Sequence, residues 1–531
     1  RAALSPPPPA ASPPRRLRPS RPAVRAMLAL SGAALLVGWI WSRAAPCGGW
    51  ENSLFGFRLW NPSDPGGYYI PSAHELGRWR GRLLYPGHPG LTLQVLLRAL
   101  QEAYFRLRAP AGASLGLTAF TAKNIVSVFL LSKMMIASLH VLSFWLFLPF
   151  ARRLLSSEFA ALLAVLGYAP SLPVVYYLTR ISVEPLMAVF FLAAFLCVWR
   201  CGEDLERGRR RRAILDGALS GAAATGALAT KFHLLWPLPA VCLLHLWWGD
   251  GARRQRGRGP ALIGFIAGAS ASLVWYCRIL DWRAFFAYWD VGGAGGLTVL
   301  GGLATLARGA ARLPLGELLP ARTRSGLFLL CEWPLLAAAA YGLFLEVRRR
   351  DAPGGRWFWL ALAGSYTVLI WAYRCFAVSG DFHGFHYLFV FILLASVFFG
   401  RACDALLSRL PFTASWQRAA AAGLLVAASH AMVLGAARDA YAYDAAQYAR
   451  IRDFGSALAA ARQGERVGLV GQVGAPVSVL LGLGVLRDSQ PRRSALIDAV
   501  DGSFVAGNAG AGPIVEIVET GGIKSARRRG E

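Results

Sequence analysis

WNPSDPGGYYIPSAHELGRWRGRLLYPGHPG, residues 60–90, is a polar stretch rich in glycine and proline. It lies between a first apolar segment, near residues 27–43, and a second that begins at about residue 125. Most of the chain that follows is a series of apolar segments. The stretch is therefore the longest polar loop near the start of the chain, and it carries ionisable and aromatic side chains that could do chemistry.

The composition predicts a membrane protein. Of the 531 residues, 55% are hydrophobic and 16% are charged, and the mean hydropathy is +0.43. Apolar runs of ~20 residues are long enough to cross a hydrocarbon core of ~30 Å as helices. We therefore expect an all-α polytopic fold rather than a soluble globule. About eleven spans are predicted, near residues 27–43, 124–150, 158–178, 181–199, 213–229, 232–248, 260–280, 326–346, 356–373, 384–400 and 417–436.

The positive charge orients these spans. The net charge is +27, and 52 of the 56 basic residues are arginine, many of them clustered between apolar segments. Such clustering is typical of loops that stay on the cytoplasmic side, and it argues against a nucleic-acid partner. Alternation then places residues 44–123, 179–180, 230–231, 281–325, 374–383 and everything after about 437 on the outer side. The chain is predicted to be an integral, multi-pass protein of the plasma or inner membrane, in contact with membrane lipids.

The two ends of the chain differ from the middle. Residues 1–26 are rich in proline and arginine and are expected to be a disordered tail. The following segment, residues 27–45, is interpreted as a retained signal anchor, with a cleaved signal peptide as the alternative. Residues 437–531 alternate helix-like and strand-like runs and predict a small extracytoplasmic α/β domain. Its strands are expected after Arg466 and after Pro513.

The first outer loop, residues 44–123, is predicted to hold two helices that lie in the membrane interface. Residues 72–84 and 91–107 have helical spacing, with apolar stripes interrupted by arginine. The second large outer loop, residues 281–325, begins with an aromatic group and continues with a glycine-rich stretch. It is expected to dip into the interface and close over a substrate, or to form a short re-entrant piece.

Ionisable residues gather where the predicted spans meet the outer side. Asp64 lies in Ser63-Asp64-Pro65, where it is either a turn-forming residue or a general base able to take a proton from a hydroxyl. Charged groups at the mouth of a helix bundle are unfavourable unless they are paired or hydrated, so they suggest a functional site. Such a set of cations fits a phosphate headgroup. The candidates for binding a phosphate or another part of a substrate are His88, Arg180, Glu184, Lys231, Arg374, His383 and His386. The eight scattered cysteines have no metal-binding spacing, and no metal or cofactor is predicted.

Several of these motifs resemble the membrane glycosyltransferases of the GT-C class, including the protein O-mannosyltransferase and aminoarabinose transferase relatives. An acidic residue in the first outer loop, followed by Leu76-Gly77 and by Tyr85-Pro86-Gly87-His88-Pro89-Gly90, is similar to the first-loop pattern of that class. Three later stretches resemble its fourth span, its A-T-K-aromatic turn and a late segment, namely Ser182-Val183-Glu184-Pro185-Leu186, Ala229-Thr230-Lys231-Phe232 and His383-Gly384-Phe385-His386-Tyr387-Leu388.

The resemblance implies an inverting transfer of a sugar from a polyprenyl-phosphate donor to a cell-surface lipid, glycan or protein acceptor on the extracytoplasmic face. Asp64 would be the base, and the cations would hold the departing lipid phosphate. Two positions depart from the family pattern: Pro65 follows Asp64 where many relatives have a second acid, and His386 stands where arginine is common. The use of a divalent metal is therefore left open.

Two other classes of function stay open. A transporter or flippase of a lipid-linked sugar would need polar or helix-breaking residues at mid-bilayer depth in paired segments. The sequence instead indicates polar residues gathered at one face, which favours an enzyme. A noncatalytic assembly factor is the third possibility, and in that case Asp64 would be replaceable.

Overall fold

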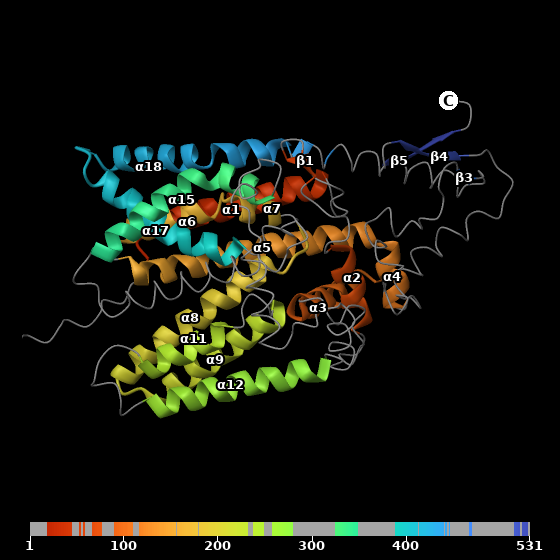
Figure 1. Cartoon of the computed structure of the whole chain (residues 1–531). Coiled ribbons are helices and arrows are strands. Elements are labelled where there is room, and N and C mark those ends of the chain that lie inside the picture. Colours follow the sequence, from red (N-terminus) through yellow and green to blue (C-terminus); the bar gives the residue numbers. More distant parts are fainter. Residues whose placement is uncertain are drawn as a thin grey trace, which may run out of the picture.

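The structure is a computed structural model of the whole chain (Figure 1). It describes residues 19–44, 53–54, 57–58, 66–76, 90–109, 116–155, 157–178, 180–231, 237–248, 258–279, 324–348, 388–412, 414–439, 441–442, 445, 467–469, 515–520 and 523–528.

Within these residues, seven helices are long and apolar enough to cross a membrane, or eight spans if one bent pair is counted as one. They confirm the predicted helical, multi-pass class, and each coincides with one of the predicted apolar ranges. At 1.5 Å per residue, even the shortest of them covers most of a hydrocarbon core. The seven helices are α1 (Arg21–Ala44), α5 (Ile125–Leu154), α8 (Glu184–Glu206), α9 (Arg210–Thr230), α12 (Arg258–Ile279), α15 (Arg324–Arg348) and α17 (Phe389–Leu407).

The helices form two groups that meet where α5 contacts α8 (Figure 1). One group is α8, α9, α12 and the shorter α11 (Pro237–Trp248). The other contains α1, α5, α15 and α17, together with α6 (Glu158–Tyr168), α7 (Leu172–Tyr177) and α18 (Ser415–Ser429). Aromatic rings fill the junction: Phe150 lies 6.3 Å from Phe191 and 5.2 Å from Trp199, measured between ring centroids. The predicted span at 356–373 lies outside the described residues.

Glycine brings α9 and α12 together without intervening side chains. A Cβ added to Gly221 would overlap the backbone oxygen of Phe265, and one added to Gly268 would overlap that of Ala218. Gly217 and Gly264 meet the opposite helix in the same way. Small residues four apart let two membrane helices approach closely, and dispersion contacts along the backbones then hold them.

Two predicted spans are not continuous helices, which corrects the sequence interpretation. Residues 158–178 divide into α6 and α7, separated by residues 169–171, and the last predicted span bends by 55° at His430, between α18 and the helix Ala431–Asp439. Side chains satisfy the backbone groups exposed at the first break. A ring nitrogen of His430 lies 3.0 Å from the carbonyl oxygen of Gly167, and the Glu332 carboxylate accepts a hydrogen bond from the backbone N–H of Leu172. Polar residues are therefore not confined to one face of the bundle.

The predicted first outer loop, residues 44–123, holds α2 (Gly66–Glu75), α3 (Leu91–Arg108) and α4 (Leu117–Lys123). The second of the two predicted loop helices is confirmed as α3, whereas the first begins at Gly66 rather than at residue 72. Figure 1 shows α2, α3 and α4 together beside one end of the bundle, where α3 contacts α9 and α5. Nothing in the composition of residues 117–123 had indicated α4.

The strands that the structure describes are short. β1 (Ser53–Leu54) pairs antiparallel with β2 (Phe57–Arg58). Near the end of the chain, β3 (Val467–Leu469) runs parallel to β4 (Val515–Thr520), which pairs antiparallel with β5 (Ile523–Arg528). The two strands predicted in this region are thus present. The helix-like runs predicted in residues 437–531 fall mostly outside the described residues. The domain boundary at 437 stays a prediction.

Candidate functional site

The centre of the candidate site is a buried ion pair. The Nζ atom of Lys231 lies 2.7 Å from Oε1 of Glu184, and the two side chains are 6% and 4% exposed. Glu184 is the first residue of α8 and Lys231 follows the last residue of α9. An acid at a helix N-terminus and a cation at a helix C-terminus both complement the helix dipole. The structure therefore brings together two candidates that the alternation of spans had placed on the same side.

The first outer loop reaches this ion pair. The Oγ1 atom of Thr92, in the first turn of α3, lies 2.6 Å from Oγ1 of Thr230, the residue before Lys231. Gly90, directly before α3, has a φ angle of +125°, which residues other than glycine rarely adopt. Its backbone lies against Tyr69 and Val183. A Cβ at Gly90 would come within 2.6 Å of the Tyr69 ring and 2.8 Å of Val183. We call the junction of residues 90–92, 180–184 and 230–231 the rim.

Arg180 contributes a second cation to the rim. Its side chain is buried, and its guanidinium carbon lies 4.0 Å from the centroid of the Tyr176 ring, a cation–π contact. Tyr176 packs edge-on against Tyr177, with ring centroids 4.8 Å apart, and Tyr177 lies 6.3 Å from Phe389 at the start of α17. The aromatic contacts thus run from Arg180 to the helix that follows the predicted histidine segment in the sequence.

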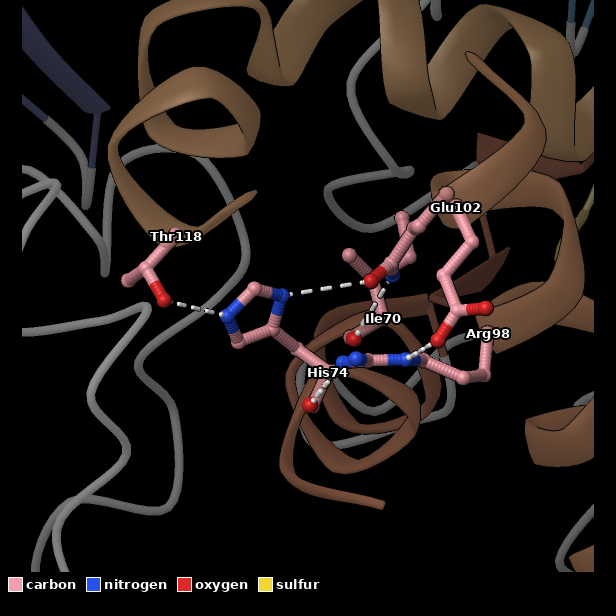
Figure 2. Close-up of polar contacts among 6 residues, drawn as sticks. Ile70, His74, Arg98, Glu102 and Thr118 are labelled. Carbon is pink, nitrogen blue, oxygen red and sulfur yellow. Dashed lines mark hydrogen bonds and ion pairs between the residues drawn. The ribbon is translucent and has the colours of Figure 1, made fainter. Parts of the chain in front are cut away.

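A set of polar contacts holds α2 against α3 and α4 (Figure 2). Arg98 donates from Nη1 to the carbonyl oxygen of His74 at 2.5 Å and pairs through Nε with Glu102 at 2.8 Å. Gln101 donates to the carbonyl oxygen of Ile70 at 3.1 Å. The ring of His74 lies between two further partners, with Nδ1 3.3 Å from Oε1 of Gln101 and Nε2 2.9 Å from Oγ1 of Thr118.

A neutral His74 can make both of these contacts. Because the amide nitrogen of Gln101 already donates to Ile70, its oxygen accepts from Nδ1–H, and Nε2 accepts the Thr118 hydroxyl proton. Burial lowers the pKa of His74 below its usual 6.5, and the charge of Arg98 lowers it further. The hydrogen bond that His74 donates to Gln101 and the charge of Glu75 raise the pKa, but the net shift is still downward.

The other candidates lie outside the residues that the structure describes: Asp64, His88, Arg374, His383 and His386. Asp64 precedes the first residue of α2 by two positions in the sequence. Of the seven predicted phosphate or substrate ligands, the structure thus places Arg180, Glu184 and Lys231. In the described part of the chain, no group of three or more histidine, cysteine or acidic residues could hold a metal ion.

Sequence reasoning missed Thr92, Arg98 and Gln101. A signal for two of them was present: Gln94, Arg98 and Gln101 are spaced i, i+4 and i+7, which places them on one face of a helix. That polar stripe was interpreted as an interruption of an apolar face. Thr92 had no signal of this kind, because its partner Thr230 is 138 positions away.

No family model matches this sequence, and no curated protein matches it. Among solved structures, the chain is similar to ArnT from Cupriavidus metallidurans bound to undecaprenyl phosphate, with 14% sequence identity, a TM-score of 0.49, and coverage of 92% of this chain and 93% of that chain.

Proposed function

We propose that the chain is a membrane glycosyltransferase of the GT-C type. It transfers a sugar from a polyprenyl-phosphate donor to a cell-surface lipid, glycan or protein acceptor on the extracytoplasmic face, with inversion at the anomeric carbon. The observation that carries the proposal is the rim, where the Glu184–Lys231 ion pair meets the start of α3 through the contact of Thr92 with Thr230. Segments far apart in the sequence, each bearing one of the resembling motifs, meet there.

The charges of the rim suit a lipid phosphate. Arg180 and Lys231 bring two positive charges and Glu184 one negative charge, so these three residues are net positive. Because all three are buried, their fields are screened less than those of exposed groups. Glu184 holds the Lys231 ammonium at the end of α9, and a cation fixed in place stabilises a departing phosphate without reorganising.

Asp64 is the proposed general base. Its carboxylate takes the proton of the acceptor hydroxyl while that oxygen forms a bond to the anomeric carbon. The bond between the anomeric carbon and the phosphate oxygen breaks on the opposite face, and the electron pair leaves with the polyprenyl phosphate. The positive charge of Lys231 and Arg180 would lower the energy of that leaving group.

Transfer by the purified chain tests the proposal. Wild type, Asp64→Asn and the matched control Asp439→Asn would be incubated with radiolabelled polyprenyl-phosphate sugars and membrane acceptors. We expect transfer by wild type and by the exposed control, and a loss of about 100-fold or more in the rate for Asp64→Asn. Full transfer by Asp64→Asn would refute the base assignment, and the absence of transfer and of donor turnover in wild type would refute the enzyme.

One observation favours the alternative, a transporter of a lipid-linked sugar. The break between α6 and α7, with His430 and Glu332 at its two sides, is a discontinuous helix among apolar spans, and such helices form substrate sites in transporters. Proteoliposomes loaded with a fluorescent polyprenyl-phosphate sugar separate the two functions. Translocation without transfer, abolished by Glu332→Gln, would support the transporter, and transfer that survives Glu332→Gln would support the enzyme.

A further inference from the structure

One face of α3 is a ladder of polar side chains directed at α2. We define the ladder as Gln94, Arg98 and Gln101, which are all buried. Gln94 accepts a hydrogen bond from the Ser72 hydroxyl at 2.7 Å, and Arg98 and Gln101 donate to carbonyl oxygens of α2, as Figure 2 shows for Arg98. Each rung therefore contacts a different part of the same short helix.

The helix α2 needs such support. It has ten residues and contains Pro71, and helices of this length are marginal on their own in water. The two carbonyl groups that the ladder binds belong to Ile70, in the middle of the helix, and to His74, in its last turn. Buried hydrogen bonds of this kind orient as well as stabilise, because moving α2 would leave several polar groups unpaired at once.

The position of α2 matters to the rim. Its residue Tyr69 lies against Gly90, which also contacts Val183 beside Glu184. Its first residue, Gly66, follows Asp64 by two positions. A shift of α2 therefore moves a wall of the rim and the attachment point of the proposed base together.

We propose that the ladder is a positioning device for the glycosyl transfer: Gln94, Arg98 and Gln101 fix α2 so that the first outer loop meets the Glu184–Lys231 rim in a reactive arrangement. The inference rests on the proposed function. The three residues act through α2, so they are positioning residues, and their removal lowers kcat more than it raises KM for the donor. A displacement of about 1 Å of a reacting group lowers the rate about 100-fold.

The test compares the same substitution at two places on α3. Arg98→Met removes the rung at the His74 carbonyl, whereas Arg106→Met, two turns further along, removes an exposed arginine from the same helix. Glu102→Gln controls for the loss of the ion pair that Arg98 also makes, and Arg98→Lys restores the charge and one donor. Each variant is assayed for kcat and for KM, and hydrogen exchange is measured on the peptides that cover α2, α8 and α9.

We expect Arg98→Met to speed exchange in residues 66–76 at least about 10-fold and to lower kcat by about 10- to 100-fold, with KM for the donor within about threefold of wild type. Arg98→Lys should recover part of kcat, and Arg106→Met and Glu102→Gln should match wild type.

Faster exchange with an unchanged kcat would overturn the proposal, as would unchanged exchange in α2 or equal losses in Arg98→Met and Arg106→Met. Exchange in α8 and α9 identifies a variant that has unfolded, in which case Gln101→Met takes the place of Arg98→Met. If wild type shows no transfer, the proposed function fails, while the exchange data still decide whether the ladder holds α2.

Discussion

The two ends of α8 carry ion pairs of opposite character. At its first residue, Glu184 pairs with Lys231 and both side chains are nearly inaccessible, at 4% and 6% exposure. Near its last residue, Glu203 pairs with Arg153 and Arg207, and the side chains of these three residues are 23–34% exposed. The two acids are separated by about 28 Å along the helix axis. One helix thus joins a buried charge pair to a hydrated charge network.

The difference indicates different tasks. A hydrated network gains little from each pair, and its arginines suit the orientation of the chain and contact with lipid headgroups. A buried pair is stabilised only by its own geometry, because both charges have given up water. A buried pair is suited to a site where a charged side chain must be held in place away from water. This is the situation proposed for Lys231 at the rim.

The largest expected effect follows from breaking the buried pair. Lys231→Met leaves the Glu184 carboxylate buried without its cation, and we expect a loss of about 3–5 kcal/mol in the free energy of unfolding. The measurement is a denaturant titration in detergent micelles. The double variant Lys231→Met with Glu184→Gln removes both charges and should recover most of that loss without recovering transfer. A loss below about 1 kcal/mol for the single variant would show that the pair is hydrated like the one at the other end of α8.

A somewhat smaller effect is expected at the close contact between α9 and α12, because Lys231 directly follows the last residue of α9. Gly221→Leu forces a side chain into the backbone of α12, and we expect a loss of about 1–3 kcal/mol in the free energy of unfolding together with reduced transfer. Gly202→Leu is the matched control, because nothing lies within 4 Å of a Cβ at that position on α8. The two variants are compared by the same titration. Equal stabilities would mean that the close approach of α9 and α12 is not what places the rim.

Sequence periodicity predicted the part of the fold that depends on local composition. Apolar runs located the seven spans, and alternation placed Glu184 and Lys231 on one side, although it gave neither their contact nor their burial. The break between α6 and α7 was missed because averaging hydropathy over residues 158–178 hides it, even though Pro170 and Pro173 lie there. The groups that satisfy that break, Glu332 and His430, are more than 150 positions away, and no local pattern connects them to it.

Acid is expected to loosen the loop that carries α2. The pKa of His74 is lowered by burial, so the unfolded chain binds more protons than the folded one between the folded pKa and 6.5. Stability is therefore present above about pH 6.5 and is lost as the pH falls below it, by at most about 1.4 kcal/mol per pH unit from this residue. Hydrogen exchange of residues 66–76 at pH 7.5 and 5.5 measures the effect. In His74→Gln the acid-induced increase, after correction for the intrinsic rate, should disappear, and an increase of the same size would assign it to another group.

The smallest expected effect is at the hydrated end of α8. Glu203→Gln removes the acid shared by Arg153 and Arg207, yet we expect a loss of less than about 1 kcal/mol, because solvent already screens these charges. Raising the salt concentration from 0.05 to 1 M shortens the screening length to about 3 Å, so the difference between wild type and Glu203→Gln should vanish. The loss caused by Lys231→Met should persist at the same salt concentration, because ions do not reach a buried pair. If salt abolished the loss of stability in both variants, the two ends of α8 would be equally hydrated. The burial of the Glu184–Lys231 pair would then no longer support a phosphate site at the rim. If salt abolished neither, Glu203 would be as important to the fold as Glu184, and burial would not be what distinguishes the rim.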